Sequence, residues 1–84
     1  MQEQTIQDAE MSYVIYSPNE SALNDGSGFW NNENGWVEFS IATRFSEEER
    51  KAFNLPISIG DDARWVYWKE ANKSYGAIEN NENN

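Results

Sequence analysis

The sequence predicts a small α+β domain: an antiparallel sheet of three to four strands, in the order β-β-β-α-β, with one helix packed on one face. Three observations carry this prediction. Runs of β-branched and aromatic residues, typical of strands, occur at 13–16, 29–41 and 63–68. An Asn-Gly pair at 34–35 interrupts the second run, as in a hairpin. A helix-start signal follows at Ser46.

The first strand is predicted over residues 13–16 (YVIY), because Ser17-Pro18 ends the run. Residues 17–28 are rich in Ser, Asn, Asp and Gly and predict a loop. A loop of this length in a small domain is often functional or mobile, and the alternative is a simple flexible connector.

The hairpin has two candidate registers. If 34–35 alone form a type I′ turn, Trp30 lies opposite Phe39 and shares its face with Val37. A four-residue loop over 32–35 would instead pair Trp30 with Val37. We favour the two-residue turn, because it produces an unbroken apolar face.

The helix is predicted over 47–53, with Ser46 and Glu49 forming a capping box. Pro56 follows and ends the helical segment, since the residue before a proline avoids the α region.

The last strand is predicted over 63–68. Its alternation places Arg64, Val66 and Trp68 on one face, and Trp65 and Tyr67 on the other. From these elements the predicted core comprises Val14, Tyr16, Trp30, Val37, Phe39, Phe45, Phe53, Leu55 and Val66.

The expected organisation is one domain over 12–70 between two polar ends. Residues 1–11 form a flexible or short helical arm in this interpretation, and 71–84 a polar, disordered tail ending in an Asn-rich run. The first ten residues contain no apolar signal segment, so the expected location is the cytoplasm.

Charge and composition exclude several classes of function. The 84 residues carry 15 acidic and 6 basic side chains, a net charge of −9, which disfavours direct binding to nucleic acid or to an anionic membrane. No apolar run approaches the ~18 residues that span a bilayer. The chain has no His and no Cys, so it lacks the usual general base, the thiolate nucleophile and the commonest metal ligands. We therefore expect no catalytic residues, no cofactor and no metal.

Two acidic pairs are candidate partner contacts, Glu47 with Glu48 and Asp61 with Asp62. Each pair also has a structural explanation. Glutamates in the first turn of a helix suit its dipole, and aspartates after Gly60 suit a turn. Neither pair has the spacing of a calcium-binding loop.

The aromatic content is the stronger indication of function. Four Trp, four Tyr and four Phe exceed what one thin core needs. We expect Trp36, Trp65 and Tyr67 to be partly exposed, as an aromatic contact patch for a protein partner or a second copy of the chain. The alternative is a second small cluster covered by the terminal arms, or aromatic side chains that are exposed singly and have no binding role.

Several segments together resemble a group of small proteins encoded by phages, plasmids and other mobile elements. The resembling segments are YVIYS at 13–17, GFWNNENGWV at 28–37, ATRFS at 42–46, LP at 55–56 and DDARWV at 61–66. The resemblance implies an accessory protein that inhibits a host defence or redirects a host enzyme, in the manner of anti-CRISPR and anti-restriction inhibitors.

The expected function is therefore a non-catalytic inhibitor or modulator that binds a bacterial host protein, with a basic nucleic-acid-binding surface as the candidate target. The alternative is a structural accessory protein that self-associates through the aromatic patch, as a homodimer for example.

Overall fold

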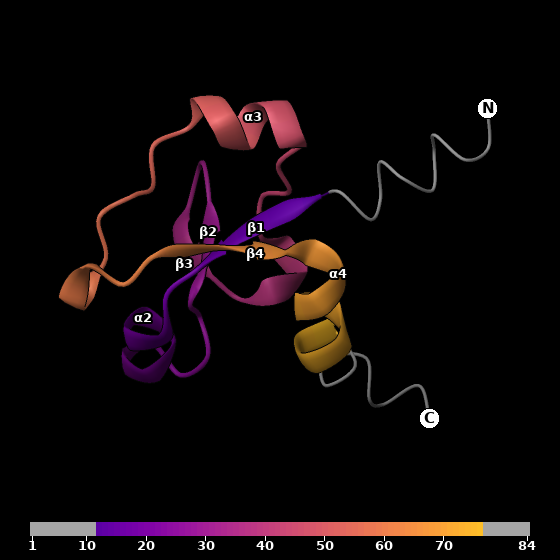
Figure 1. Cartoon of the computed structure of the whole chain (residues 1–84). Helices are drawn as coiled ribbons and strands as arrows, with labels where there is room; N and C mark the ends of the chain where they lie inside the picture. The colour runs from indigo at the N-terminus through magenta and orange to yellow at the C-terminus, as the bar shows by residue number, and fades with distance from the viewer. Residues whose placement is uncertain (1–11, 77–84) are drawn as a thin grey trace.

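The computed structural model describes residues 12–76, and the predicted arm at 1–11 and the end of the predicted tail, 77–84, lie outside them. The α+β prediction is confirmed: four short antiparallel strands form one sheet in the order β3-β2-β1-β4 (Figure 1). The strands are β1 (Tyr13–Tyr16), β2 (Phe29–Asn31), β3 (Gly35–Val37) and β4 (Arg64–Tyr67). The helices are α2 (Pro18–Leu23), α3 (Glu47–Ala52) and α4 (Trp68–Ala71), with single turns η1 (Phe39–Ile41), η2 (Ile59–Asp61) and η3 (Asn72–Gly76).

The first half of the predicted loop at 17–28 is a helix, α2, so that part of the prediction is wrong. Ser17 caps it by accepting a hydrogen bond from the amide of Glu20 at 3.0 Å, and Pro18 occupies the first turn, where its missing N–H costs nothing. After α2 the chain leads to β2, and the carbonyl of Gly28, just before β2, accepts a hydrogen bond from the amide of Ser17.

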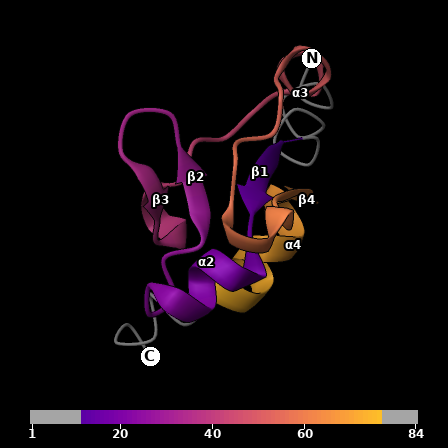
Figure 2. The ribbon, with the colours of Figure 1, turned by 90° about the vertical axis from the view of Figure 1, so that its left-hand side faces the viewer.

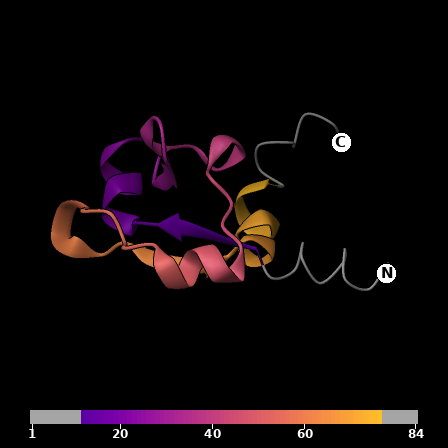
Figure 3. The ribbon, with the colours of Figure 1, turned by 90° about the horizontal axis from the view of Figure 1, so that it is seen from above.

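The folded part also continues past residue 70. Ala71 in α4 is buried, and Tyr75 in η3 packs against the same cluster, so residues 71–76 belong to the domain rather than to a disordered tail. The described residues therefore form more helices than the single one predicted on one face. Figures 1 and 3 show α3 and α4 as separate elements beside the sheet.

The hairpin register differs from both predicted registers. Trp30 pairs with Trp36 and Asn31 with Gly35, so the turn has three residues, 32–34. The cause is the Asn31 side chain, whose Oδ1 accepts from the amides of residues 33 and 34, so the turn begins at residue 32, two residues before the favoured turn at 34–35. Phe39 then falls outside the strand, in η1.

Each face of the sheet carries its own apolar cluster, because side chains alternate along a strand. One cluster is built on Val14, Phe29, Phe39 and Ala71, and Val66 and Trp68 pack against it. The other is built on Tyr13, Ile15 and Phe45, and is joined by Trp30, Trp36, Phe53 and Trp65. The alternation predicted for 63–68 is confirmed, and the aromatic surplus largely fills the second face.

Most of the predicted core is buried or half-buried. Val14, Val37, Phe39 and Phe45 are buried, and Tyr16, Trp30, Phe53 and Val66 are half-buried. The prediction that Leu55 belongs to the core is wrong. Leu55 is 42% exposed, because the chain after α3 runs outward from the sheet. The fully buried Ile15 and Phe29 were missed.

Candidate functional site

The segment between α3 and β4 exposes three apolar side chains in alternation. Leu55, Ile57 and Ile59 are 42%, 91% and 53% exposed, whereas Ser58 between the last two is buried. We call Leu55, Ile57 and Ile59 the connector ridge. Figures 1 and 2 show the segment from α3 to η2 as an extended stretch of chain that is not part of the sheet. A single exposed apolar side chain needs no explanation, but three along one short segment are a candidate interaction surface.

The buried Ser58 side chain forms three hydrogen bonds at the end of the ridge. Its Oγ donates to Oδ1 of Asp62 at 3.0 Å and accepts from the amides of Asp62 and Ala63 at 2.9 and 3.0 Å. The hydroxyl therefore closes the turn at η2, and the backbone that carries Ile57 and Ile59 is held at a defined point.

Asp62 connects this turn to α2. Its carboxylate accepts from the Ser17 hydroxyl and, at 2.8 Å, from the amide of Asn19. Burial alone would raise the pKa of Asp62, but the hydrogen bonds from Ser17, Asn19 and Ser58 outweigh it, so the pKa lies below its usual range. Asp62, a predicted partner contact, is thus committed within the fold.

A second set of hydrogen bonds ties Ile59 itself to α2. Its amide donates to Oε2 of Glu20 at 3.0 Å, and its carbonyl accepts from Nδ2 of Asn19 at 3.0 Å. Glu20 is only 8% exposed, and its other oxygen accepts from Asn24. The C-terminal end of the ridge, at Ile59, is therefore bonded to α2.

Glu47, another predicted contact, also has an internal role. It accepts hydrogen bonds from the Tyr13 hydroxyl at 2.5 Å and from Arg50 at 2.9 Å, while the Arg50 guanidinium lies 4.8 Å from the Tyr13 ring centroid. The bond from Tyr13, followed by that from Arg50, lowers the pKa of Glu47. The capping box of Ser46 and Glu49 is present as predicted, and Glu48 remains exposed.

The predicted aromatic contacts do not form one patch. Trp36 on β3 and Trp65 on β4 lie on opposite edge strands of the sheet and are half-buried. Tyr67 is 48% exposed and stacks on Tyr13, with ring centroids 5.0 Å apart. Asp61 is exposed and has a φ of 53°, in the left-handed region.

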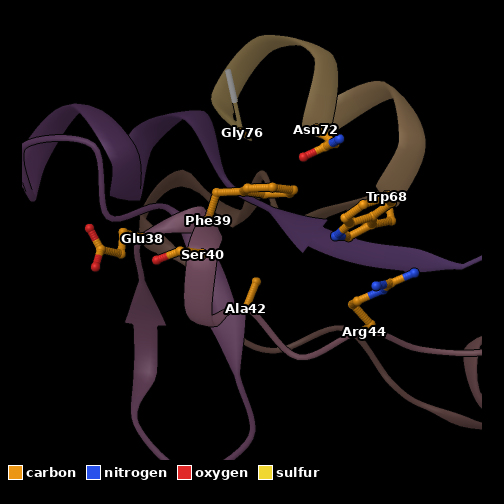
Figure 4. A pocket seen from close by; sticks show the side chains of 8 residues that line it. All are labelled: Glu38, Phe39, Ser40, Ala42, Arg44, Trp68, Asn72 and Gly76. Atoms are coloured by element: carbon orange, nitrogen blue, oxygen red, sulfur yellow. The ribbon is translucent and has the colours of Figure 1, made fainter. Parts of the chain in front are cut away.

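A separate hollow lies against α4 and η1. Glu38, Phe39, Ser40, Ala42, Arg44, Trp68, Asn72 and Gly76 line a cavity of about 600 Å³ (Figure 4). The Arg44 guanidinium lies 4.0 Å from the centroid of the Trp68 ring. Its lining divides between apolar side chains, Phe39, Ala42 and Trp68, and polar ones, Glu38, Ser40, Arg44 and Asn72.

Within residues 12–76, His, Cys, Asp and Glu side chains form no group of three able to hold a metal ion. Over the same residues, the helices are too short and too polar to cross a bilayer. Comparison with protein-family models, with curated proteins and with solved structures finds no match.

The connector ridge was missed by the sequence predictions. Its signal is the alternation of Leu55, Ile57 and Ile59 around Pro56 and Ser58, which resembles a half-buried strand. That pattern predicts which side chains share a face, but it does not predict that Ser58, bonded to Asp62, is the buried residue and that the three apolar side chains are exposed.

Proposed function

We propose that this protein is a non-catalytic protein-binding inhibitor or modulator of a host defence or nucleic-acid enzyme, acting in the cytoplasm of a bacterial host. The observation that carries the proposal is Ile57, the most exposed member of the ridge at 91%. The resemblance to proteins of mobile elements supplies the class of target.

The anchoring of the ridge favours a binding role. Association is penalised by the entropy of ordering loops and side chains at the interface. Here Asp62 and Glu20 hold the end of the ridge, at Ser58 and Ile59, in the free protein. A partner with an apolar cleft therefore gains the burial of Ile59, whose backbone is already held, together with that of Ile57 two residues before it.

Charge favours a basic partner. Residues 12–76 hold ten acidic and six basic side chains, a net charge of −4, and the exposed Asp61 follows the ridge directly. We propose that the partner presents an apolar cleft bordered by Lys or Arg, as at a nucleic-acid-binding surface. The acidic surface accelerates encounter, and the ridge supplies most of the affinity.

Site-specific cross-linking tests this proposal. A photoreactive phenylalanine at position 57 should capture a host protein, and the same group at Ile41, 49% exposed in η1, is the matched control. The purified partner should then bind the unlabelled protein, with an association rate that falls as salt is raised. Equal capture from both positions, or an association rate independent of salt, would argue against the proposal.

Self-association is the second candidate. β4 is an edge strand, and Tyr67 at its end is 48% exposed, so β4 could pair with a second copy. Repulsion between two chains of net charge −9 opposes it at low salt. Light scattering distinguishes the two: a monomer favours host-protein binding, and a dimer disrupted by Tyr67→Lys favours self-association.

A further inference from the structure

The cavity beside α4 is built from one cationic side chain and an aromatic floor. Phe39 and Trp68 lie with ring centroids 6.0 Å apart and planes at 28°, and Arg44 lies over Trp68. Figure 4 shows Glu38 and Ser40 at the end away from Trp68, and Asn72 on the opposite wall from Arg44. The cavity thus has a cationic end and a polar end joined by apolar surface.

The Arg44 guanidinium has N–H donors that form no hydrogen bond within residues 12–76. A guanidinium has five N–H donors. Nη2 makes one long hydrogen bond of 3.4 Å to the Ser12 hydroxyl, and among residues 12–76 no carboxylate forms an ion pair with Arg44. Stacking on the indole holds the plane of the guanidinium, which leaves its edge free to form the bidentate contact that suits a carboxylate.

The other residues that line the cavity indicate which class of ligand it can bind. Glu38 and the overall acidity of the protein disfavour multiply charged anions such as nucleotides. Phe39, Ala42 and Trp68 offer an apolar surface to the body of the ligand, and a volume of about 600 Å³ lies within the range of small-molecule sites.

We propose that this cavity binds a monocarboxylate carried on an aromatic or apolar body, with the carboxylate on Arg44 and the body over Phe39 and Trp68. The ligand is either a free small molecule or the C-terminal residue of a peptide, which share this chemistry. The site is independent of the connector ridge: in Figures 1 and 3, α4 and η2 lie at opposite ends of the domain.

A titration of the full chain with two matched probes tests the proposal. N-acetylphenylalanine should cause saturable NMR shifts at the Trp68 indole N–H, and N-acetylphenylalaninamide, which has the same body without the charge, should not. Arg44→Gln should weaken binding of the acid by about tenfold or more, as expected for loss of a charged bidentate contact. Arg44→Lys, which keeps the charge but not the planar fork, should give an intermediate loss.

Arg64→Gln is the control, because Arg64 is exposed on β4 and does not line the cavity. A longer probe, acetyl-Gly-Gly-Phe with a free carboxylate, identifies the source: tighter binding than N-acetylphenylalanine indicates a peptide terminus, and equal binding a free carboxylate. Equal binding of the acid and the amide, no saturable shift with either, or unchanged binding by a folded Arg44→Gln variant would overturn the proposal.

Discussion

The Ser17 hydroxyl donates a hydrogen bond to Oδ1 of Asp62, joining positions 45 residues apart. The same hydroxyl caps α2, and the same carboxylate closes the turn after the connector ridge through Ser58. One pair of side chains thus couples the start of α2 to the surface that we propose binds the partner.

Asp62→Asn is expected to lower the thermal midpoint clearly more than Asp61→Asn. The amide replaces one acceptor oxygen of Asp62 with a donor, opposite groups that themselves donate. Asp61 is exposed, and asparagine tolerates its left-handed backbone, so the neighbouring substitution is a matched control. Equal midpoints for the two variants would mean that the Asp62 network does not stabilise the fold.

The hydrogen bond between Ser17 and Asp62 also makes the stability of the fold depend on pH. The pKa of Asp62 is lowered by folding, so its contribution to stability is present above the unfolded value of about 3.9 and is lost as pH falls through the lower folded pKa. The difference in unfolding free energy between the wild type and Asp62→Asn should therefore be constant at neutral pH and shrink below about pH 4. Urea titrations at pH 7 and pH 3 measure it, and a difference that grows in acid would contradict the assignment.

Tyr13 is expected to ionise above the ordinary pKa of a tyrosine. Its hydrogen bond to Glu47, assisted by burial, raises its pKa to about 12. The stability from this interaction is therefore present below pH 10 and is lost as pH rises through the folded value. Spectrophotometric titration of Glu47→Gln should show this tyrosine ionising at lower pH, and an unchanged curve would refute the link. Glu48→Gln is the control, because it removes the adjacent carboxylate, which is exposed.

Gly28→Ala should destabilise the protein by about 1–3 kcal/mol, as overpacking does. A Cβ at this position would lie 2.5 Å from Cβ of Ser21 and 2.7 Å from the carbonyl oxygen of Ser17, both fixed by α2. Chemical denaturation measures the loss, with Ser27→Ala as the adjacent control. A variant as stable as the wild type would show that α2 does not pack this closely on the start of β2.

Phe29→Ala should cost about 3–5 kcal/mol, a large part of the stability of a domain this size. Phe29 is 1% exposed and contacts the rings of Tyr16, Phe39 and Tyr75. The half-buried Phe53 is the comparison, and Phe53→Ala should cost less. A larger loss at Phe53 would place the main core on the other face.

The features predicted correctly from sequence are local ones. The capping box depends on Ser46 and Glu49 alone, and the face alternation of β4 depends only on strand geometry. The hairpin register was wrong because the Asn31 side chain, rather than the Asn-Gly pair, sets where the turn begins.

The connector ridge could not be predicted, because its anchor is not local. Ile59 bonds to Glu20 across 39 positions, and Asp62 bonds to Asn19 across 43. The acids Asp62 and Glu47 were interpreted as partner contacts from their charge alone. Arg50 and Ser58 are near them in sequence, but Tyr13 and Ser17, which also bond to them, are 34 and 45 positions away.

The affinity of the cross-linked partner for Ile57→Ser and Ile41→Ser variants tests the central proposal most directly. Burying an isoleucine contributes about 1.5–3 kcal/mol, so Ile57→Ser should raise the Kd about ten- to hundredfold, whereas Ile41→Ser should leave it nearly unchanged. Both side chains are exposed, so neither substitution should alter the fold. An unchanged Kd for Ile57→Ser, or an equal loss for Ile41→Ser, would contradict the assignment of the ridge as the binding surface.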